Sequence, residues 1–311
     1  KQQVHVRIDE ISALYTTEWL NDEPVDRPAV GSRKMRLRMG QSARARLGLE
    51  PHSAKDAPVL AVVEPFGPHP TLTDREAESR GEFVERLLDN GSQSSLLILA
   101  PHGGDIERHT DEQARHLHDL IGSAHASVWY CLGFAFNPNQ RRAVLGRGLP
   151  RTPSAFQRWH ITSADVSEQS FPKLKAVADR RYLLAVSFHG MNGEGVLLGG
   201  AAPESLKQEL ARELEQALGP QGARSNLTVR IARPGASLSG STPANIVNRY
   251  ARSGGIQIEQ SSIARREWGL LIADAVARVL RRHLPSGPRP GAPENPNRPG
   301  PAPIPSGPEP I

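Results

Sequence analysis

Residues 95–110, with the sequence SLLILAPHGGDIERHT, decide how the rest of this chain is interpreted. The apolar run 96–100 is bounded by polar residues and predicts a buried strand. Pro101 ends that run, and a loop with two glycines follows, carrying His102 and Glu107. Glycines let a backbone fold back tightly, and open α/β sheets bind their ligands at the carboxyl ends of strands. We therefore expect the chemistry of this protein at this loop, where two side chains can hold a metal.

Length and composition bound the class of protein. The 311 residues can bury one large core and a smaller module, because single cores stop growing at roughly 250 residues. A formal net charge of +5 favours polyanionic partners, although a solvated arginine-rich surface gives the same balance. The single cysteine, Cys131, excludes an internal disulfide and a cysteine-based zinc ribbon.

No stretch of the sequence indicates a membrane or targeting segment. None reaches the roughly 20 apolar residues of a spanning helix, so we expect no membrane insertion. Residues 1–20 show no signal-peptide pattern, and the compartment stays open, with a secreted or phage-associated protein among the options.

Strand and helix patterns alternate over most of the chain. The patterns predict strands at 95–100, 127–134, 158–162, 182–188, 195–199, 227–232 and 255–260, and helices at 74–89, 111–122, 168–180, 204–218, 243–251 and 262–283. Thr110 and Gln113 are spaced as a capping box for the second helix. This alternation predicts an α/β fold with three layers, in which helices cover both faces of a mixed central sheet.

Four segments are expected. Residues 1–65 predict a small β-rich accessory unit, with strands at 4–8, 33–39 and 59–63 and a short helix or turn at 41–49. A linker and helix follow at 66–94, and the α/β domain spans 95–284. Residues 285–311 hold eleven prolines and no periodicity, which predicts a disordered tail.

Three predicted strand ends carry ligand-type side chains. The first is the loop with His102 and Glu107, the second ends at His189 in YLLAVSFHG, and the third ends at Glu259 in GIQIEQ. Two imidazoles and one carboxylate with an open fourth position form a known catalytic zinc arrangement. A second glutamate that does not bind the metal can then accept a proton from water.

Five short motifs recur in an order that resembles the poly-γ-glutamate hydrolases of phage and bacterial origin, enzymes similar to zinc carboxypeptidases. The motifs are APHGGxIE at 100–107, HITS at 160–163, SFHG at 187–190, NIVNR at 245–249 and QIE at 257–259. The resemblance covers roughly residues 80–283. It implies a zinc ion held by His102, Glu107 and His189, with Glu259 as general base, and an acidic γ-linked peptide polymer as substrate.

Recognition of an acidic substrate needs a cation near the metal. Arg249, next to Asn248, is the leading candidate, because guanidinium and amide donors can grip a carboxylate. Arg265 is the reserve for binding substrate or the oxyanion, and His160 is expected to line the same pocket. Asp105 departs from the family pattern, and its negative charge is expected to disfavour a polyanion.

Other functions fit parts of the sequence. Amide hydrolysis on cell-wall peptides is an enzymatic alternative. A non-catalytic polymer-binding module is another, as is a nucleic-acid binder that uses the basic residues at 33–38 with Arg44 and Arg46. We expect a monomer and do not expect nucleic acid as the partner.

Overall fold

A computed structural model describes residues 2–8, 11–17, 46–47, 62–91, 94–146, 152–224 and 227–285, and the structural statements below concern these residues. Within them, no helix is both long enough and apolar enough to cross a bilayer. The strand predicted at 33–39, the helix or turn predicted at 41–49 apart from residues 46–47, and the tail predicted at 285–311 apart from residue 285 lie outside these ranges.

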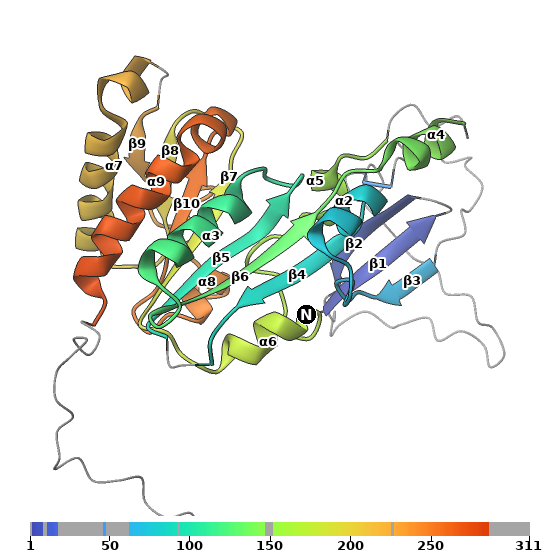
Figure 1. Ribbon diagram of the computed structural model, residues 1–311, viewed down its shortest axis with the longest axis horizontal. Helices are drawn as coiled ribbons and strands as arrows, with labels where there is room; N and C mark the ends of the chain where they lie inside the picture. Colours follow the sequence, from blue (N-terminus) through green and yellow to red (C-terminus); the bar gives the residue numbers. More distant parts are fainter. Residues whose placement is uncertain are drawn as a thin grey trace, which may run out of the picture.

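The core of the molecule is a mixed sheet of seven strands (Figure 1). In spatial order they are β4 (Phe83–Leu88), β6 (Ala126–Gly133), β5 (Leu96–Gly104), β7 (Leu184–Gly190), β10 (Ile256–Gln260), β8 (Val196–Gly199) and β9 (Val229–Ile231). The four strands β6, β5, β7 and β10 run parallel, while β4 and β8 join them antiparallel. This confirms the predicted α/β fold with a mixed central sheet.

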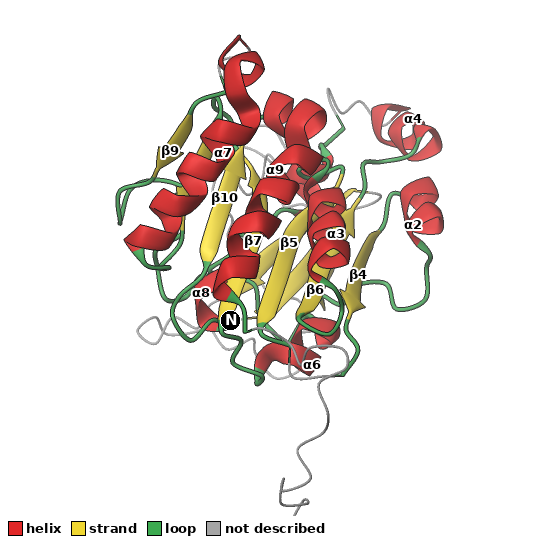
Figure 2. Ribbon diagram, turned by 60° about the vertical axis from the view of Figure 1, so that its left-hand side comes forward, coloured by secondary structure: helices red, strands yellow, loops and turns green. Residues whose placement is uncertain are grey.

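Helices cover both faces of this sheet (Figure 2). One face carries α3 (Thr110–Ile121), α7 (Glu204–Arg224) and α9 (Ser262–His283); the other carries α5 (Ala155–Trp159), α6 (Pro172–Ala178) and α8 (Ile246–Arg249). Two further helices are α2 (Asp74–Arg80) and α4 (Pro138–Gly146). Strand β5 explains why both faces are apolar: Leu96 and Ile98 belong to one core cluster and Leu97 and Leu99 to the other, because successive side chains of a strand point to opposite faces.

The N-terminal strands form a second, three-stranded sheet. It consists of β1 (Gln2–Ile8), β2 (Ile11–Thr17) and β3 (Val62–Pro65) in the order β2-β1-β3, with antiparallel pairing. The strand predicted at 4–8 is confirmed, whereas β2 was missed. Leu14 and Phe66 are buried in the same core cluster as Trp159 and Phe83, so this sheet packs against the α/β domain. The predicted boundary at residue 65 stays a prediction.

The predicted helix over 74–89 is wrong in its second half. Helix α2 ends at Gly81, whose φ of 65° is left-handed and suits glycine. Strand β4 then pairs antiparallel with β6, with Phe83 opposite Gly133 and Leu88 opposite Val128. The apolar residues 83, 87 and 88 fit a helical face in the sequence, but pairing with a distant strand decides the structure.

Two local predictions also differ. The strand predicted at 158–162 is replaced by helix α5 and a loop, because Ser154 and Gln157 form a capping box that starts a helix. At α3 the N-cap is His109 in a left-handed conformation with φ 74°, and Gln113 donates a hydrogen bond to the Gln260 side chain instead of capping the helix.

Glu85 on β4 links the sheet to α6, and this generates a stability prediction. Its buried carboxylate accepts hydrogen bonds from Trp129 Nε1 (2.7 Å) and from the backbone N–H groups of Lys173 (3.0 Å) and Leu174 (2.8 Å) at the start of α6. Glu85→Ala should lower the free energy of unfolding by about 3 kcal/mol, because buried donors lose their acceptor. Denaturant unfolding measures this. The exposed Glu78→Ala is the control, with an expected change within about 0.5 kcal/mol, and an equally small effect of Glu85→Ala would contradict the assignment.

Candidate metal centre

The carboxyl ends of three neighbouring strands, β5, β7 and β10, bring the predicted site residues together. After β5 the chain continues to β6 on one side of it, whereas β7 lies on the other side. Such a reversal in strand order leaves a crevice at the carboxyl ends of the strands. Pairing between β5 and β7 stops at Leu99 and Ser187, so the two strands separate just before His102 and His189.

The loop after β5 is shaped by its backbone. The register with β6 shifts between Ala100 and Gly103, a bulge that re-aims the side chain of His102. The Glu107 N–H then donates to the His102 carbonyl oxygen (2.8 Å), which closes a tight turn and returns Glu107 to His102. A Cβ at Gly103 would lie 2.5 Å from the Cys131 carbonyl oxygen, so only glycine fits there.

Three donor atoms from these strands form a compact triangle. His102 Nδ1 lies 3.1 Å from Glu107 Oε2 and 3.2 Å from His189 Nδ1, and His189 Nδ1 lies 3.6 Å from Glu107 Oε2. All three side chains are buried. The triangle joins residues separated by up to 87 positions in the sequence.

The outer nitrogen of each imidazole is held by a neighbour. His102 Nε2 lies 2.7 Å from the Ile161 carbonyl oxygen, which can only accept, so Nε2 carries a proton and Nδ1 offers the lone pair in the neutral ring. His189 Nε2 lies 2.6 Å from Ser187 Oγ. Supports of this kind orient metal-binding histidines. The Gly190 N–H donates to Glu107 Oε2 (2.9 Å) and fixes the carboxylate.

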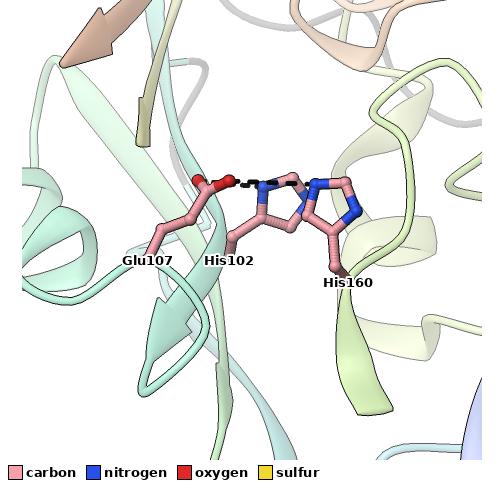
Figure 3. Close-up of side chains that lie close together, drawn as sticks. All are labelled: His102, Glu107 and His160. Atoms are coloured by element: carbon pink, nitrogen blue, oxygen red, sulfur yellow. Dashed lines mark hydrogen bonds and ion pairs between the residues drawn. The ribbon is translucent and has the colours of Figure 1, made fainter. Parts of the chain in front are cut away.

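A third histidine, His160, lies beside His102 and Glu107 (Figure 3). Its Nε2 lies 3.8 Å from Glu107 Oε1, and its ring centroid lies 4.2 Å from that of His102. Donor atoms of His102, Glu107 and His160 fall within 4.8 Å of one another, so this trio can also hold a metal. Burial, followed by the nearby His102, lowers the pKa of His160 to about 2, which keeps the ring neutral.

His189 fits the third ligand position better than His160. Zinc bonds of about 2.0–2.1 Å in tetrahedral geometry place neighbouring donors about 3.3 Å apart. The two distances from His189 Nδ1 (3.2 and 3.6 Å) and the third edge of the triangle (3.1 Å) match this spacing, whereas the 3.8 Å contact of His160 is made to the other carboxylate oxygen, Oε1. The donor set of two imidazoles and one carboxylate therefore fits zinc, with His160 at the rim.

The buried charges of the triangle compensate one another. Burial would raise the pKa of Glu107, but interactions with His102 and His189 outweigh it and hold that pKa well below its usual range. Burial would likewise lower the pKa of His102, and Glu107 reverses this and raises it. The two groups thus favour each other's charged forms, and a metal cation bound here would compensate the same carboxylate.

Glu259 stands beside the triangle on β10. Strand pairing places it next to His189, and its side chain is buried. Gln257 Nε2 donates to Glu259 Oε1 (2.8 Å), and Asn245 Nδ2 in turn donates to Gln257 Oε1 (2.7 Å). Burial raises the pKa of Glu259, the direction required of a carboxylate that exchanges protons near neutral pH.

Arg265 of α9 also reaches this centre. Its guanidinium packs on Gly190, where no Cβ would fit, and it donates from Nε to the Arg108 carbonyl oxygen (3.0 Å) and from Nη1 to that of Gln260. Burial lowers the pKa of Arg265, while the charges of Glu107 and Glu259 act in the opposite direction. The cation therefore lies close to both acidic groups of the site.

Arg249 and Asn248 do not join this group in the structure. Ala251 bridges to Tyr182 at the opposite end of β7, and Arg249 lies there, donating from Nη2 to the Val166 carbonyl oxygen. Asn248 Oδ1 accepts from the Ala201 and Gly255 N–H groups, so this side chain braces loops. The geometry gives no support to the predicted roles of these two residues. The residue of the NIVNR motif that is connected to the site is Asn245, through its hydrogen bond to Gln257.

Sequence reasoning missed the supporting residues. Ser187, Gln257 and Asn245 were not singled out, although Gln257 and Glu259, two positions apart on one strand, had to share a face. No local signal identifies the Ile161 carbonyl as the partner of His102.

A family model and one curated protein match parts of this sequence. A family model described as poly-gamma-glutamate hydrolase matches residues 148–269. The SPbeta prophage-derived protein YoqZ of Bacillus subtilis (strain 168) is 29% identical over 192 residues, which cover 61% of this chain and 57% of that protein. The match thus spans less than two thirds of the length of this relative.

Two solved structures are also similar. A bacteriophage poly-gamma-glutamate hydrolase is 24% identical, with 65% of this chain and 89% of that chain covered and a TM-score of 0.45. A zinc-free YndL structure is 20% identical, with 64% and 90% covered and a TM-score of 0.45. His160, His189 and Glu259 lie within the span of the family model, and His102 and Glu107 precede it. The predicted resemblance is confirmed: residues 148–269 of this chain match the poly-gamma-glutamate hydrolase family.

Proposed function

We propose that this protein is a zinc-dependent hydrolase that cleaves γ-glutamyl amide bonds in poly-γ-glutamate or a similar acidic polymer. One observation carries the proposal: His102 Nδ1, Glu107 Oε2 and His189 Nδ1 lie 3.1–3.6 Å apart beside a buried Glu259. The family match supports a hydrolase, and the donor set supports a metal. Zinc is the proposed metal because two imidazoles and a carboxylate form one of its catalytic ligand sets.

The metal and Glu259 divide the chemistry. Zinc, when bound by His102, Glu107 and His189, supplies a Lewis acid that polarises an amide carbonyl and makes water more acidic. Glu259 accepts a proton from the attacking water at Oε2, the oxygen that Gln257 does not hold, and passes it to the leaving amine. The hydrogen bond from Gln257 keeps the carboxylate in one orientation during both transfers.

Arg265 supplies positive charge on the Gly190 side of the centre. Its Nε and Nη1 bonds fix the guanidinium plane, and Nη2 is the nitrogen that these bonds do not hold. This donor can stabilise the oxyanion or a substrate carboxylate. Asp105, expected to disfavour a polyanion, forms an ion pair with Arg108 (2.6 Å) and accepts from the Ala135 N–H (3.0 Å), which offsets its charge.

Two alternatives stay open to test. Hydrolysis of cell-wall peptides would use the same residues, and substrate comparison separates it from polyglutamate cleavage. Nucleic-acid binding would be insensitive to chelators and would fall steeply with salt. Residues 33–38 and Arg44, on which that alternative rests, lie outside the described residues. The expected monomeric state stays a prediction.

The first prediction concerns the metal ligands. Purified protein should bind one equivalent of zinc by elemental analysis, and His102→Ala or His189→Ala should weaken zinc binding at least about tenfold by removing a ligand. His160→Ala should retain the metal. His116→Ala is the control, since His116 pairs with Asp274 on the helical face. Retention in His189→Ala together with loss in His160→Ala would instead make His160 the ligand.

The second prediction concerns the general base. Glu259→Gln should retain zinc and lose about 10²- to 10⁴-fold in kcat, because the amide cannot accept the proton. Hydrolysis of poly-γ-glutamate, followed by release of new amino groups, measures this. The exposed Glu215→Gln on α7 is the matched control. A Glu259→Gln enzyme with normal turnover would mean that another group takes the proton.

The third prediction separates the two arginines. Arg265→Met should lower kcat/KM by about 10²- to 10³-fold, because a donor near the reacting carbonyl is removed. Arg249→Met should change kcat/KM less than about threefold, because its guanidinium lies at the other end of β7. Kinetics of both variants on one γ-linked glutamate oligomer test this, and the reverse order of effects would restore Arg249 to the site.

A further inference from the structure

A pocket of ≈ 370 Å³ lies between the N-terminal sheet and the metal centre. Thr16 of β2 and Arg46 line it from the N-terminal part of the chain, and Phe156, His160 and Thr162 line it from α5 and the following loop. Its volume is within the roughly 300–1,000 Å³ of small-ligand sites. We call it the Arg46 pocket.

The pocket and the metal centre share a wall. His160 lines the pocket, and its Nε2 lies 3.8 Å from Glu107 Oε1. Ile161 also lines the pocket, and its carbonyl oxygen holds His102 Nε2 (2.7 Å). A ligand in the Arg46 pocket would therefore lie directly beside the groups proposed to cleave the substrate.

Arg46 is held in this wall by two backbone carbonyl groups and an aromatic ring. Its Nε donates to the Gln157 carbonyl oxygen (2.7 Å) and its Nη2 to that of His160 (3.0 Å), and its Cζ lies 4.8 Å from the centroid of the Tyr15 ring. Within the described part of the chain, no carboxylate forms an ion pair with this guanidinium. Burial lowers the pKa of Arg46, while Tyr15 acts in the opposite direction. Asp165 also lines the pocket.

We infer that the Arg46 pocket binds the free α-carboxylate of one γ-linked glutamyl unit next to the cleaved bond, with Arg46 as the anion-binding residue. This rests on the proposed function, in which every repeat unit carries such a carboxylate. A rigid, partly desolvated guanidinium prefers a carboxylate, and hydroxyl groups of Thr16 and Thr162 can complete the contact. Phe156, stacked on His160 at 4.2 Å, offers an apolar wall for the methylene groups of the unit.

The inference gives the N-terminal sheet a role in specificity. Arg46 precedes the span of the family model by about a hundred residues, so the hydrolase match does not supply this contact. The N-terminal part of the chain would then select the acidic polymer, while the α/β domain cleaves it.

Two γ-linked glutamate trimers test the inference, one with free α-carboxylates and one with α-carboxamides. Calorimetry in the Glu259→Gln background should give about 10- to 100-fold tighter binding of the carboxylate trimer, the effect of one charged hydrogen-bonded contact. Arg46→Met should reduce this preference to less than about threefold. Arg46→Lys should keep part of the preference for the carboxylate trimer, because lysine retains the positive charge but cannot reproduce the hydrogen bonds of the guanidinium to the Gln157 and His160 carbonyl oxygens.

The preference between the trimers separates a binding role of Arg46 from a structural one. If Arg46 were only structural, Arg46→Met would weaken the binding of both trimers equally, and so would Arg46→Lys. Equal weakening of both trimers in either variant would overturn the inference. Turnover of poly-γ-glutamate by the wild type is measured in parallel. If the wild type cleaves the polymer but Arg46→Met keeps the full preference for the carboxylate trimer, only the Arg46 pocket is rejected. If binding depends on Arg46 but the wild type does not cleave the polymer, the hydrolase function is rejected and the pocket is supported. Neither binding nor turnover rejects both.

Discussion

The buried carboxylate of Glu107 is the constraint on which the site depends. An ion this far from water is costly unless it is paired and hydrogen bonded. Glu107 Oε2 meets this need with His102 Nδ1 (3.1 Å), the Gly190 N–H (2.9 Å) and, at 3.6 Å, His189 Nδ1. These partners come from two strands, so the charge fixes the ends of β5 and β7 relative to each other. In the proposed metal site a divalent cation would compensate the same carboxylate, with the Nδ1 atoms of His102 and His189 as its other two donors.

The sheet creates the space for this arrangement. Leu99 is the last β5 residue paired with β7, and beyond it the bulge at 101–102 turns the chain away. The resulting gap admits two imidazole rings whose Nδ1 atoms lie 3.2 Å apart. On the other side of β7, strand β10 continues in register to Glu259, opposite His189. β5 separates from one edge of β7 while β10 stays paired along the other edge, and this places the proposed metal ligands next to Glu259, the proposed base.

The sequence predicts those parts that local patterns determine. The strands carrying His102 and His189 are largely apolar runs with residues in both core clusters, and such runs locate parallel strands well. The strand carrying Glu259 instead alternates Ile256 and Ile258 with polar residues, a pattern that also predicts a strand. Predictions from the sequence fail where contacts with residues distant in the sequence determine the structure. Residues 83–88 fit a helical face in the sequence, but they pair with β6 as a strand. Arg249 was predicted to bind an anion, but its contacts with Val166 and Glu168 place it at the opposite end of β7 from the site. The strand predicted at 158–162 fails for a different reason, because the capping box of Ser154 and Gln157 is a local signal for a helix.

The charges around the centre give a reason for the position of the N-terminal sheet. Leu14 of β2 is fully buried in the cluster that contains Trp159 and Ile161, so the sheet packs on the segment that carries His160. Arg46 is one of the charges that lower the pKa of His160, after the larger effects of burial, His102, Glu107 and His189, and the charges of Glu107 and Glu259 raise the pKa of Arg265 against the larger effect of burial. Two guanidinium groups from separate elements thus border the metal centre. In the proposed function, an acidic polymer would meet positive charge at both positions.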